Sequence, residues 1–438
     1  MISKWGSVKV EDIAEVRSGK RLPKGQVLIS EPTAHPYIRL VDVDNGRVQS
    51  RNLQYLSVET RASIKRYVVN TDDICLAIVG HTIGMVFYIE DQWDDVNLTE
   101  NAARITNLSS SFNPRFIYYY LTSPIGQQEI ISRKVGSAQG KLPLYNIKSL
   151  EIPNIPRIIQ DKVVGILDSL SLKYELNAET NQTLEEMAQA IFKSWFVDFD
   201  PVKAKMNGEQ PEGMDAATAS LFPEKLVESE LGLIPEGWEV TKLSKVIDLL
   251  NGFAFKSPDY VKEGTFVLRT KNFDSSNSVE RLGDDVYLPD EFLESHKKYL
   301  CEAYDYHVVM VAASIGKTAM IYPHQLPALR NQNMWCFRPK DESLRFYTKY
   351  MVDGLVKLNM GLASGSARAF FKKGDFNSYE LALPSSELLT KFNDVVGNLV
   401  KQKGSLLNQN VQLAAMRDTL LPKLLSGEIE LGTEAGES

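Results

Sequence analysis

The chain has 438 residues, of which 43% are hydrophobic and 24% charged, and its formal net charge is −7 at pH 7. This balance excludes a disordered or collagen-like chain, and at about 100–200 residues per domain the length predicts two or three domains. No apolar run approaches the roughly 20 residues of a membrane span, and three cysteines are too few for a disulfide framework. We therefore expect a cytosolic protein without a signal peptide or membrane contact. The acidic balance at first argues against nucleic-acid binding, which favours basic surfaces.

The chain repeats itself once, because short matching segments recur in the same order 229–233 residues apart. The matches are Trp5 with Trp238, Ser18-Gly19 with Asn251-Gly252, Ile38-Arg39 with Leu268-Arg269, Thr82-Ile83-Gly84 with Ser314-Ile315-Gly316, Glu100-Asn101 with Gln332-Asn333, residues 136–139 with 365–368, and Asn181, Leu184 and Met187 with Asn410, Leu413 and Met416. Solenoid repeats are much shorter, about 20–50 residues. The long period therefore predicts two copies of a whole module, each with its own core.

The first part of each copy is typical of a mixed α/β globular domain. Short apolar runs, such as residues 73–80 and 307–312, are bounded by turn residues and indicate buried strands. Residues 115–121 and 345–351 are more typical of helices.

The end of each copy predicts one long helix with a narrow apolar stripe. From residue 157 to 196, and again from 392 to 424, apolar residues that include Met187 and Met416 recur at spacings of three and four. Such a stripe is typical of a coiled-coil seam, in which Asn177, Asn181 and Asn410 would fix the register. The matched position, length and polar gap favour pairing of the two helices with each other. The alternative is two amphipathic helices, each lying on its own globular domain.

These patterns divide the chain into five expected regions. The globular modules would be residues 1–153 and 236–384, and the helical regions residues 154–200 and 385–438, the last with a C-terminal tail. Residues 201–235 would form a linker with a short helix near residues 215–221, because prolines and glycines interrupt this segment.

Sequence signatures of catalysis are missing from the chain. Residues 314–318 resemble the end of a phosphate-binding loop, but Val311 stands where that loop needs glycine. The five histidines have no metal-ligand spacing, and neither a nucleophile elbow nor a methyltransferase tetrapeptide occurs. We therefore expect a protein that binds rather than one that catalyses.

The globular modules instead carry basic and amide side chains in loop-like segments. These segments are residues 18–24 and 134–141 in the first module and residues 330–333 and 365–373 in the second. Lys and Arg neutralise phosphates, while Arg, Asn and Gln can read the edges of guanine and adenine. The alternative is that these segments are ordinary surface turns.

Three further segments carry a resemblance to a known family. They are residues 187–201 at the end of the first long helix, Ile-Pro-Glu-Gly-Trp ending at Trp238, and residues 421–429. Together with two variable modules that alternate with two repeated helices, they make the whole chain closely resemble the specificity (S) subunit of type I restriction-modification systems. The resemblance implies two α/β target recognition domains with pseudo-two-fold symmetry, separated by an antiparallel coiled coil. Each domain would read one half of a bipartite, asymmetric target in double-stranded DNA.

The resemblance also implies a division of labour between subunits. The paired helices would set the spacer between the half-sites and dock two modification (methyltransferase) subunits, through which restriction subunits would join. Those partners would bind S-adenosylmethionine, ATP and Mg²⁺ and would methylate and cleave DNA. This chain would be non-catalytic, with no cofactor or metal of its own.

We expect DNA contacts from polar side chains at the loop segments and nearby matched positions. In the first module these are Lys20, Arg21, Lys24, Arg39, Lys134, Ser137, Gln139 and Lys141, and in the second they are Lys256, Arg269, Lys271, Lys317, Arg330, Asn331, Gln332, Arg368, Lys372 and Lys373. Among them, Lys20, Arg21 and Lys24 are expected to contact phosphates, and Gln139 and Arg368 to read bases.

Aromatic residues are bunched at the end of the first long helix beyond what its seam needs. We expect Phe192, Trp195, Phe196 and Phe199 to dock a partner subunit. The alternative is that they pack within the chain.

Two other functions stay open from the sequence. One is the specificity subunit of a related, fused restriction-methylation enzyme with the same two modules. The other, from a different class, is a coiled-coil scaffold whose modules bind peptides.

The distribution of charge reconciles the acidic chain with DNA binding. Residues 1–150 hold 18 Lys and Arg against 15 Asp and Glu, residues 236–385 hold 19 against 19, and the remainder holds 12 against 22. The acidity therefore lies on the helices and linker, while the modules are close to neutral. We expect the isolated chain to bind DNA poorly, because the partner subunits would supply much of the charge that faces the phosphates.

Overall fold

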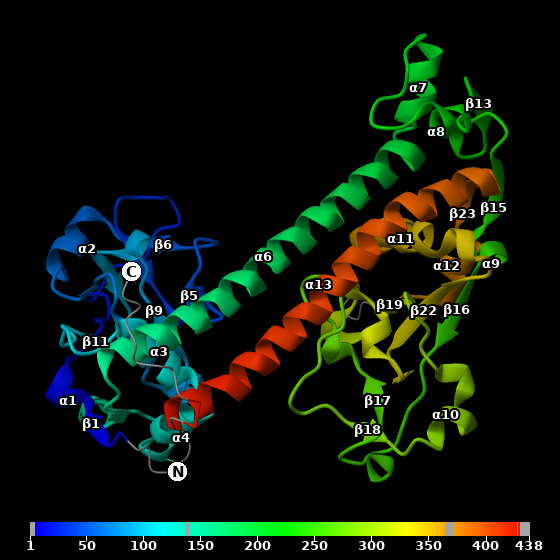
Figure 1. Ribbon diagram of the computed structural model, residues 1–438. Coiled ribbons are helices and arrows are strands. Elements are labelled where there is room, and N and C mark those ends of the chain that lie inside the picture. The colour runs from blue at the N-terminus through cyan, green and yellow to red at the C-terminus, as the bar shows by residue number, and fades with distance from the viewer. Residues whose placement is uncertain (1–4, 137–139, 364–370, 427, 430–438) are drawn as a thin grey trace, which may run out of the picture. The chain divides into compact units, whose positions relative to one another are not determined.

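The computed structural model describes residues 5–136, 140–363, 371–426 and 428–429. It divides into two compact units (Figure 1): unit 1 holds residues 1–174 and 411–438, and unit 2 holds residues 175–410. Two long helices, α6 (Arg157–Phe196) and α13 (Ser386–Ser426), each contribute one part to each unit. Within the described ranges, no helix is long and apolar enough to cross a membrane.

Unit 1 is built on two sheets. The larger sheet has the strand order β2-β11-β8-β9-β5-β4, and the smaller sheet has the order β6-β3-β10-β7. The strands of the larger sheet are β2 (Glu15–Ser18), β4 (Val43–Asp44), β5 (Arg47–Val48), β8 (Ile74–Ala77), β9 (Val86–Tyr88) and β11 (Ala102–Thr106). Those of the smaller sheet are β3 (Pro36–Ile38), β6 (Gln54–Tyr55), β7 (Val68–Val69) and β10 (Val96–Leu98). Strand β8 is buried along its whole length, as the apolar run at residues 73–80 predicts.

Short helices cover the core of unit 1. They are α1 (Val10–Ile13), α2 (Val58–Ser63), α3 (Pro114–Thr122), α4 (Pro124–Ser132) and α5 (Leu144–Lys148). Helix α3 begins at Pro114 because proline suits the first turn and the Asn113 side chain accepts hydrogen bonds from the exposed N–H groups. Its buried Phe116 and Ile117 pack in one cluster with Ile74 of β8.

Unit 2 repeats this plan. Its sheets have the strand orders β16-β22-β19-β20 and β18-β17-β21, which match β2-β11-β8-β9 and β6-β3-β10 of unit 1 one for one. The strands are β16 (Ile247–Asn251), β17 (Thr265–Leu268), β18 (Tyr287–Leu288), β19 (Tyr306–Val309), β20 (Thr318–Met320), β21 (Ala328–Arg330) and β22 (Met334–Pro339). The helices are α9 (Leu243–Val246), α10 (Phe292–Ser295), α11 (Arg345–Ala363) and α12 (Lys373–Ser378). The sequence repeat is therefore a repeat of the fold, and the mixed α/β class is confirmed.

A short antiparallel strand pair joins the start of each module to its end. In unit 1, β1 (Ser7–Lys9) pairs with β12 (Glu151–Pro153), and in unit 2, β15 (Glu239–Lys242) pairs with β23 (Glu380–Leu383). The long helices α6 and α13 begin just after β12 and β23. Each module therefore leads directly into its helix.

The two long helices pair within each unit, as the apolar stripe predicts, and they run antiparallel, as the resemblance implies. In unit 2, Asn177 Nδ2 of α6 donates to Asn410 Oδ1 of α13 at 2.9 Å, and the rings of Phe196 and Phe392 lie 4.9 Å apart. In unit 1, residues 163–167 of α6 share an apolar cluster with residues 421–425 of α13. Exposed Met187 and Met416 are not seam residues, which corrects that part of the expected stripe.

The segment after α6 folds as part of unit 2. Phe199 has a left-handed backbone with φ of 55°, so the chain turns away from the axis of α6 before α7 (Asp200–Met206) begins. Helix α8 (Ala216–Ser220) follows, at the place where the sequence predicts a short helix. Strands β13 (Leu226–Ser229) and β14 (Gly232–Pro235) then form a hairpin.

A buried ion triad ties both long helices to the globular part of unit 2. The carboxylate of Glu185 on α6 lies 2.6 Å from Lys349 Nζ of α11 and 3.0 Å from Lys403 Nζ of α13. The side chains of the two lysines are only 1% and 3% exposed. Burial works against the charge of Glu185, but the two ammonium groups outweigh it and lower the pKa of Glu185 to about 2. Removing Glu185 would leave the buried Lys403 without an acidic partner among the described residues, although Lys349 would keep Asp353 at 3.2 Å.

We expect Glu185→Gln to lower the free energy of unfolding by about 3–5 kcal/mol at neutral pH, because the two lysines lose a shared carboxylate. The folded pKa of Glu185 lies below its ordinary value of 4.5, so the wild-type chain loses this stabilisation as the pH falls from about 4.5 towards 2. The variant should lose less stability over that range. Urea unfolding at several pH values measures both effects. Glu186→Gln, on the exposed side of the same helix, is the matched control, and equal behaviour of the two variants would contradict the role of the triad.

Candidate nucleic-acid interface

In unit 1, loops from both sheets meet where β2, β3, β8 and β10 end. Backbone hydrogen bonds connect them: Lys20 N–H donates to Leu98 O at 2.9 Å, and Thr99 N–H donates to Ile38 O at 3.0 Å. Ile78 N–H also donates to Asn101 O at 2.9 Å, which brings in the loop after β8. The loops therefore form one continuous surface at this end of the module.

Unit 2 builds the same end in the same way. Phe253 N–H donates to Arg330 O at 3.1 Å, Asn331 N–H to Leu268 O at 2.9 Å, and Met310 N–H to Asn333 O at 3.2 Å. These bonds join the loops that follow β16, β17, β19 and β21, the counterparts of the strands that end at the loops of unit 1.

Glycine is required where the first loop crosses the next one. A Cβ on Gly19 would lie 2.0 Å from Thr99 O, and a Cβ on Gly252 would lie 1.7 Å from Asn331 O. Both distances are far shorter than any real contact, so a side chain at either position would force the loops apart. The matched glycines found in the sequence repeat thus hold the two loops together.

The expected DNA contacts of unit 1 mostly lie at this end. Exposed Lys20, Arg21 and Lys24 follow Gly19, and Arg21 pairs with Glu100 at 2.8 Å. Exposed Lys134 and Lys141 flank a neighbouring loop, which is closed by two backbone hydrogen bonds between residues 135 and 141. Ser137 and Gln139 lie outside the described residues.

Arg39 and its counterpart Arg269 are held in place by their own modules. The Arg39 guanidinium forms a bidentate pair with Asp42, with N–O distances of 2.9 and 2.7 Å. Arg269 Nη2 donates to Asp284 O at 2.8 Å and lies 3.7 Å from a carboxylate oxygen of Asp285. Both side chains are half-buried, so each offers only part of its guanidinium to a ligand.

In unit 2 the expected contacts divide into free and engaged side chains. Lys256, Lys317, Gln332 and Lys372 are exposed, and Asn331 is half-buried between the crossing loops. Two further lysines have partners: Lys271 forms an ion pair with Asp284, and Lys373 Nζ donates to Leu249 O at 2.6 Å. Arg368 lies outside the described residues.

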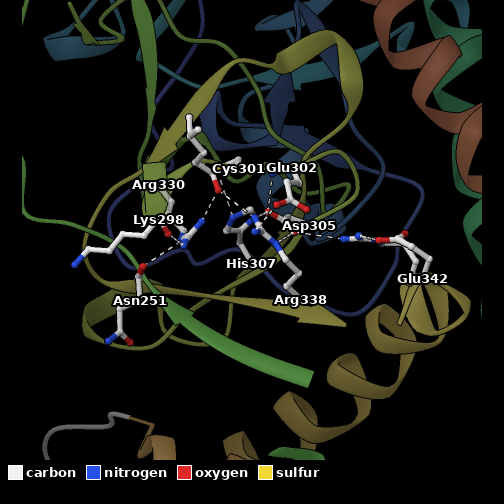
Figure 2. A network of polar contacts seen from close by, with 11 residues as sticks. Asn251, Lys298, Cys301, Glu302, Asp305, His307, Arg330, Arg338 and Glu342 are labelled. Atoms are coloured by element: carbon white, nitrogen blue, oxygen red, sulfur yellow. Dashed lines mark hydrogen bonds and ion pairs between the residues drawn. The ribbon is translucent and has the colours of Figure 1, made fainter. Parts of the chain in front are cut away.

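Arg330 is buried rather than presented to solvent, with 1% of its surface exposed. Its guanidinium donates to the backbone oxygens of Asn251 at 3.0 Å and Leu300 at 2.7 Å, and also to that of Lys298 (Figure 2). These bonds use the guanidinium inside the module. We therefore leave Arg330 out of the DNA-contacting surface.

The aromatic residues expected to dock a partner lie in the core of unit 2. Trp195 and Phe196 are buried, and Phe192 and Phe199 pack against the same cluster. The ring of Phe199, for example, lies 5.5 Å from that of Trp238. This placement favours the alternative that the four aromatics pack within the chain.

One group of buried side chains has the composition of a metal site. Donor atoms of Asp305, His307 and Cys336 lie within 4.8 Å of one another. However, Asp305 already accepts hydrogen bonds from Arg338 at 2.9 and 2.5 Å, and Arg345 lies 3.5 Å away (Figure 2). Burial raises the pKa of the Cys336 thiol. The group fits a buried ion-pair network better than a cation site.

A pair of basic segments beside the loops is missing from the expected contacts. Residues 63–67 are Ser-Ile-Lys-Arg-Tyr, and residues 295–299 are Ser-His-Lys-Lys-Tyr. They lie at the spacing of the internal repeat, so aligning the two copies residue by residue would have found them.

Comparison with known proteins points to one family. The family model of the type I restriction modification DNA specificity domain matches residues 2–186 and 235–395. The chain is 27% identical to the type I restriction enzyme HindI specificity subunit of Haemophilus influenzae, over 90% of this chain and 94% of that protein. It is 22% identical to the MjaIX specificity subunit of Methanocaldococcus jannaschii, over 72% of this chain and 69% of that protein.

A solved structure has the same fold. The S subunit of the type I restriction-modification system of M. genitalium aligns over 96% of each chain, with a TM-score of 0.53 and 16% sequence identity. The family model covers both modules and most of the chain, which confirms the resemblance found in the sequence. The chain therefore belongs to the family of type I restriction-modification DNA specificity subunits.

Proposed function

We propose that this chain is non-catalytic and supplies the sequence specificity of its restriction-modification complex, with each module reading one half of a bipartite, asymmetric DNA target. The observation that best supports this proposal is that the two modules share the same loop backbone but carry different side chains on it. The same hydrogen-bonded loops close the same end of both modules, yet the residue after the matched glycine is Lys20 in one and Phe253 in the other. A constant frame with unlike side chains suits two unlike half-sites.

The proposal gives the helical regions, residues 154–200 and 385–438, two roles. They set the spacer between the half-sites, and they dock two modification subunits, through which restriction subunits join. The 40 residues of α6 make a rod of about 60 Å at 1.5 Å per residue. One turn of B-DNA is about 34–36 Å long, so a helix of this length is longer than one turn of the duplex.

Exposed apolar side chains on α6 support a docking surface for a modification subunit. Within unit 2, Leu176 is 52% exposed and Met187 is 48% exposed. They lie about three turns apart on the same side of the helix. Because the fully buried core of a protein–protein interface is apolar and Met is enriched in interfaces, we assign this face to the modification subunit.

The charge distribution fits a reader that relies on its partners. The two modules, residues 1–153 and 236–384, are close to neutral, and the acidic excess lies outside them. We propose that the modification subunits supply phosphate contacts around the duplex. The proposed place of action of the complex is the cytoplasm.

Methylation mapping tests the proposed function directly. Co-expression of the chain with its modification subunit should methylate adenines within one bipartite sequence that has a fixed spacer. Sequencing of the host DNA gives both half-sites at once. If no such sequence appears, and the complex binds a peptide partner but not DNA, the scaffold alternative replaces the proposal.

Shortening the rod should change the spacer and leave the half-sites alone. We expect removal of one heptad from α6 and the matched heptad from α13, away from the Asn177–Asn410 pair, to shorten the mapped spacer. The readout is the same methylation map. An unchanged spacer in a folded, active variant would show that the helices do not set it.

Charge on the exposed face of α6 should release the modification subunit. We expect Leu176→Glu with Met187→Glu to abolish co-purification of that subunit, because two carboxylates would be buried without partners. Ala178→Glu with Gln182→Glu adds the same charge at exposed positions on another side of α6 and should have little effect. Equal loss of the subunit in both variants would contradict the assigned face.

A further inference from the structure

Both modules carry a similar basic turn next to the loop that follows the matched glycine, Gly19 or Gly252. We call this loop the recognition loop. The turns are residues 63–67 and 295–299, which we call the basic turns. Tyr67 N–H donates to Ile64 O at 3.0 Å, and Tyr299 N–H donates to His296 O at 2.8 Å, so the two segments close in the same way. This likeness persists although the surrounding loops differ in sequence.

The charged side chains of the basic turns are exposed, and Lys298 Nζ also lies 5.0 Å from the centre of the Tyr299 ring. Lys65 and Arg66 in unit 1 and Lys297 and Lys298 in unit 2 are all exposed. None of the four makes an ion pair with another residue that the structure describes. Each turn thus presents two adjacent uncompensated positive charges.

A buried polar side chain fastens each basic turn to the neighbouring strand. In unit 1, Asn97 Nδ2 of β10 donates to Ile64 O and Tyr67 O, both at 3.0 Å. In unit 2, Arg330 of β21, the strand that matches β10, donates to Lys298 O and Leu300 O (Figure 2). Burying an amide or a guanidinium is costly unless it is fully hydrogen-bonded. Both modules nevertheless place such a group where it holds the turn.

Each basic turn also contacts the recognition loop through its tyrosine. Lys20 Nζ lies 5.3 Å from the centre of the Tyr67 ring, and the rings of Phe253 and Tyr299 are 4.9 Å apart. Lys20 and Phe253 occupy the same position, directly after the matched glycine. The basic turns therefore flank the loops that the proposed function assigns to DNA.

We propose that the basic turns are phosphate-binding elements, which clamp the DNA backbone beside each half-site. This inference rests on the proposed function. Contacts to phosphates position a protein on DNA without reading its sequence, whereas base contacts must differ between unlike half-sites. The two turns keep the same charge while the loops beside them diverge, which is the pattern expected of backbone contacts.

The test measures DNA affinity of the complex of the full chain with its modification subunits at several salt concentrations. Two labelled duplexes are used, one carrying the mapped target and one of scrambled sequence. Removing two phosphate contacts should make the negative slope of log K against log salt shallower by about 1.8. We expect this change for Lys297→Gln with Lys298→Gln, and for Lys65→Gln with Arg66→Gln, together with weaker binding of both duplexes and an unchanged methylation target.

The matched control is Lys242→Gln with Lys245→Gln. These lysines are also exposed, and they precede β16, whereas the recognition loop follows it. If the basic-turn variants keep the slope of this control while still preferring the target duplex, the inference is wrong and the proposed function stands. A changed target with an unchanged slope would instead mean base contacts and would also overturn the phosphate role. If the wild-type complex shows no preference for the target, the proposed function itself fails.

Discussion

Each module depends on one pair of short parallel strands, β3 with β10 in unit 1 and β17 with β21 in unit 2. Parallel strands end at the same edge of a sheet, so the loops that follow them leave side by side. The end of the larger sheet is then joined to these loops by a crossing at Gly19 or Gly252, which is too close for any side chain. The candidate interface is a consequence of this arrangement, since the same crossing recurs wherever the strand order recurs. Apart from these two glycines, nothing in the loop sequences themselves would bring these segments together.

Behind the loops, each module buries a carboxylate at a matched position, Asp73 or Asp305. Its arginine partner is Arg104 at 3.1 Å in unit 1 and Arg338 at 2.5 Å in unit 2. These arginines do not match in the repeat, because Arg104 corresponds to Cys336, two residues before Arg338. Side chains two residues apart on a strand point to the same face. An arginine at either of these two positions can therefore reach the carboxylate. Burial raises the pKa of Asp73, whereas around Asp305 the hydrogen bonds and charge of Arg338 outweigh burial and hold the pKa of that carboxyl below its ordinary value.

The sequence predicts the repeated fold better than it predicts the site. Apolar runs, turn residues and spacings of three and four are local signals, so the strands, the long helices and the pairing of these helices could be foreseen. Side-chain direction depends on tertiary packing, which those signals do not contain. In the sequence, Arg330 is typical of a DNA contact because the amide side chains of Asn331 and Gln332 follow it. In the structure it ends a buried strand and points inward. Likewise, Phe196 belongs to a group of aromatic residues larger than a helix seam requires, but it packs against Phe392 and the rest of the core of unit 2.

The exchange of Asn97 for Arg330 as the fastener of the basic turn shows how the two modules could diverge without losing their fold. What the buried carbonyl groups require is a donor in reach, and an amide or a guanidinium meets that requirement equally. The same holds for the carboxylates at residues 73 and 305, whose cation comes from different strand positions. The frame thus constrains hydrogen-bonding capacity and close approach rather than residue identity. The exposed loop positions carry neither constraint, because their partners would lie outside the chain. A module built in this way can change what its loops contact while the strands, glycine crossings and buried ion pairs behind them stay in place.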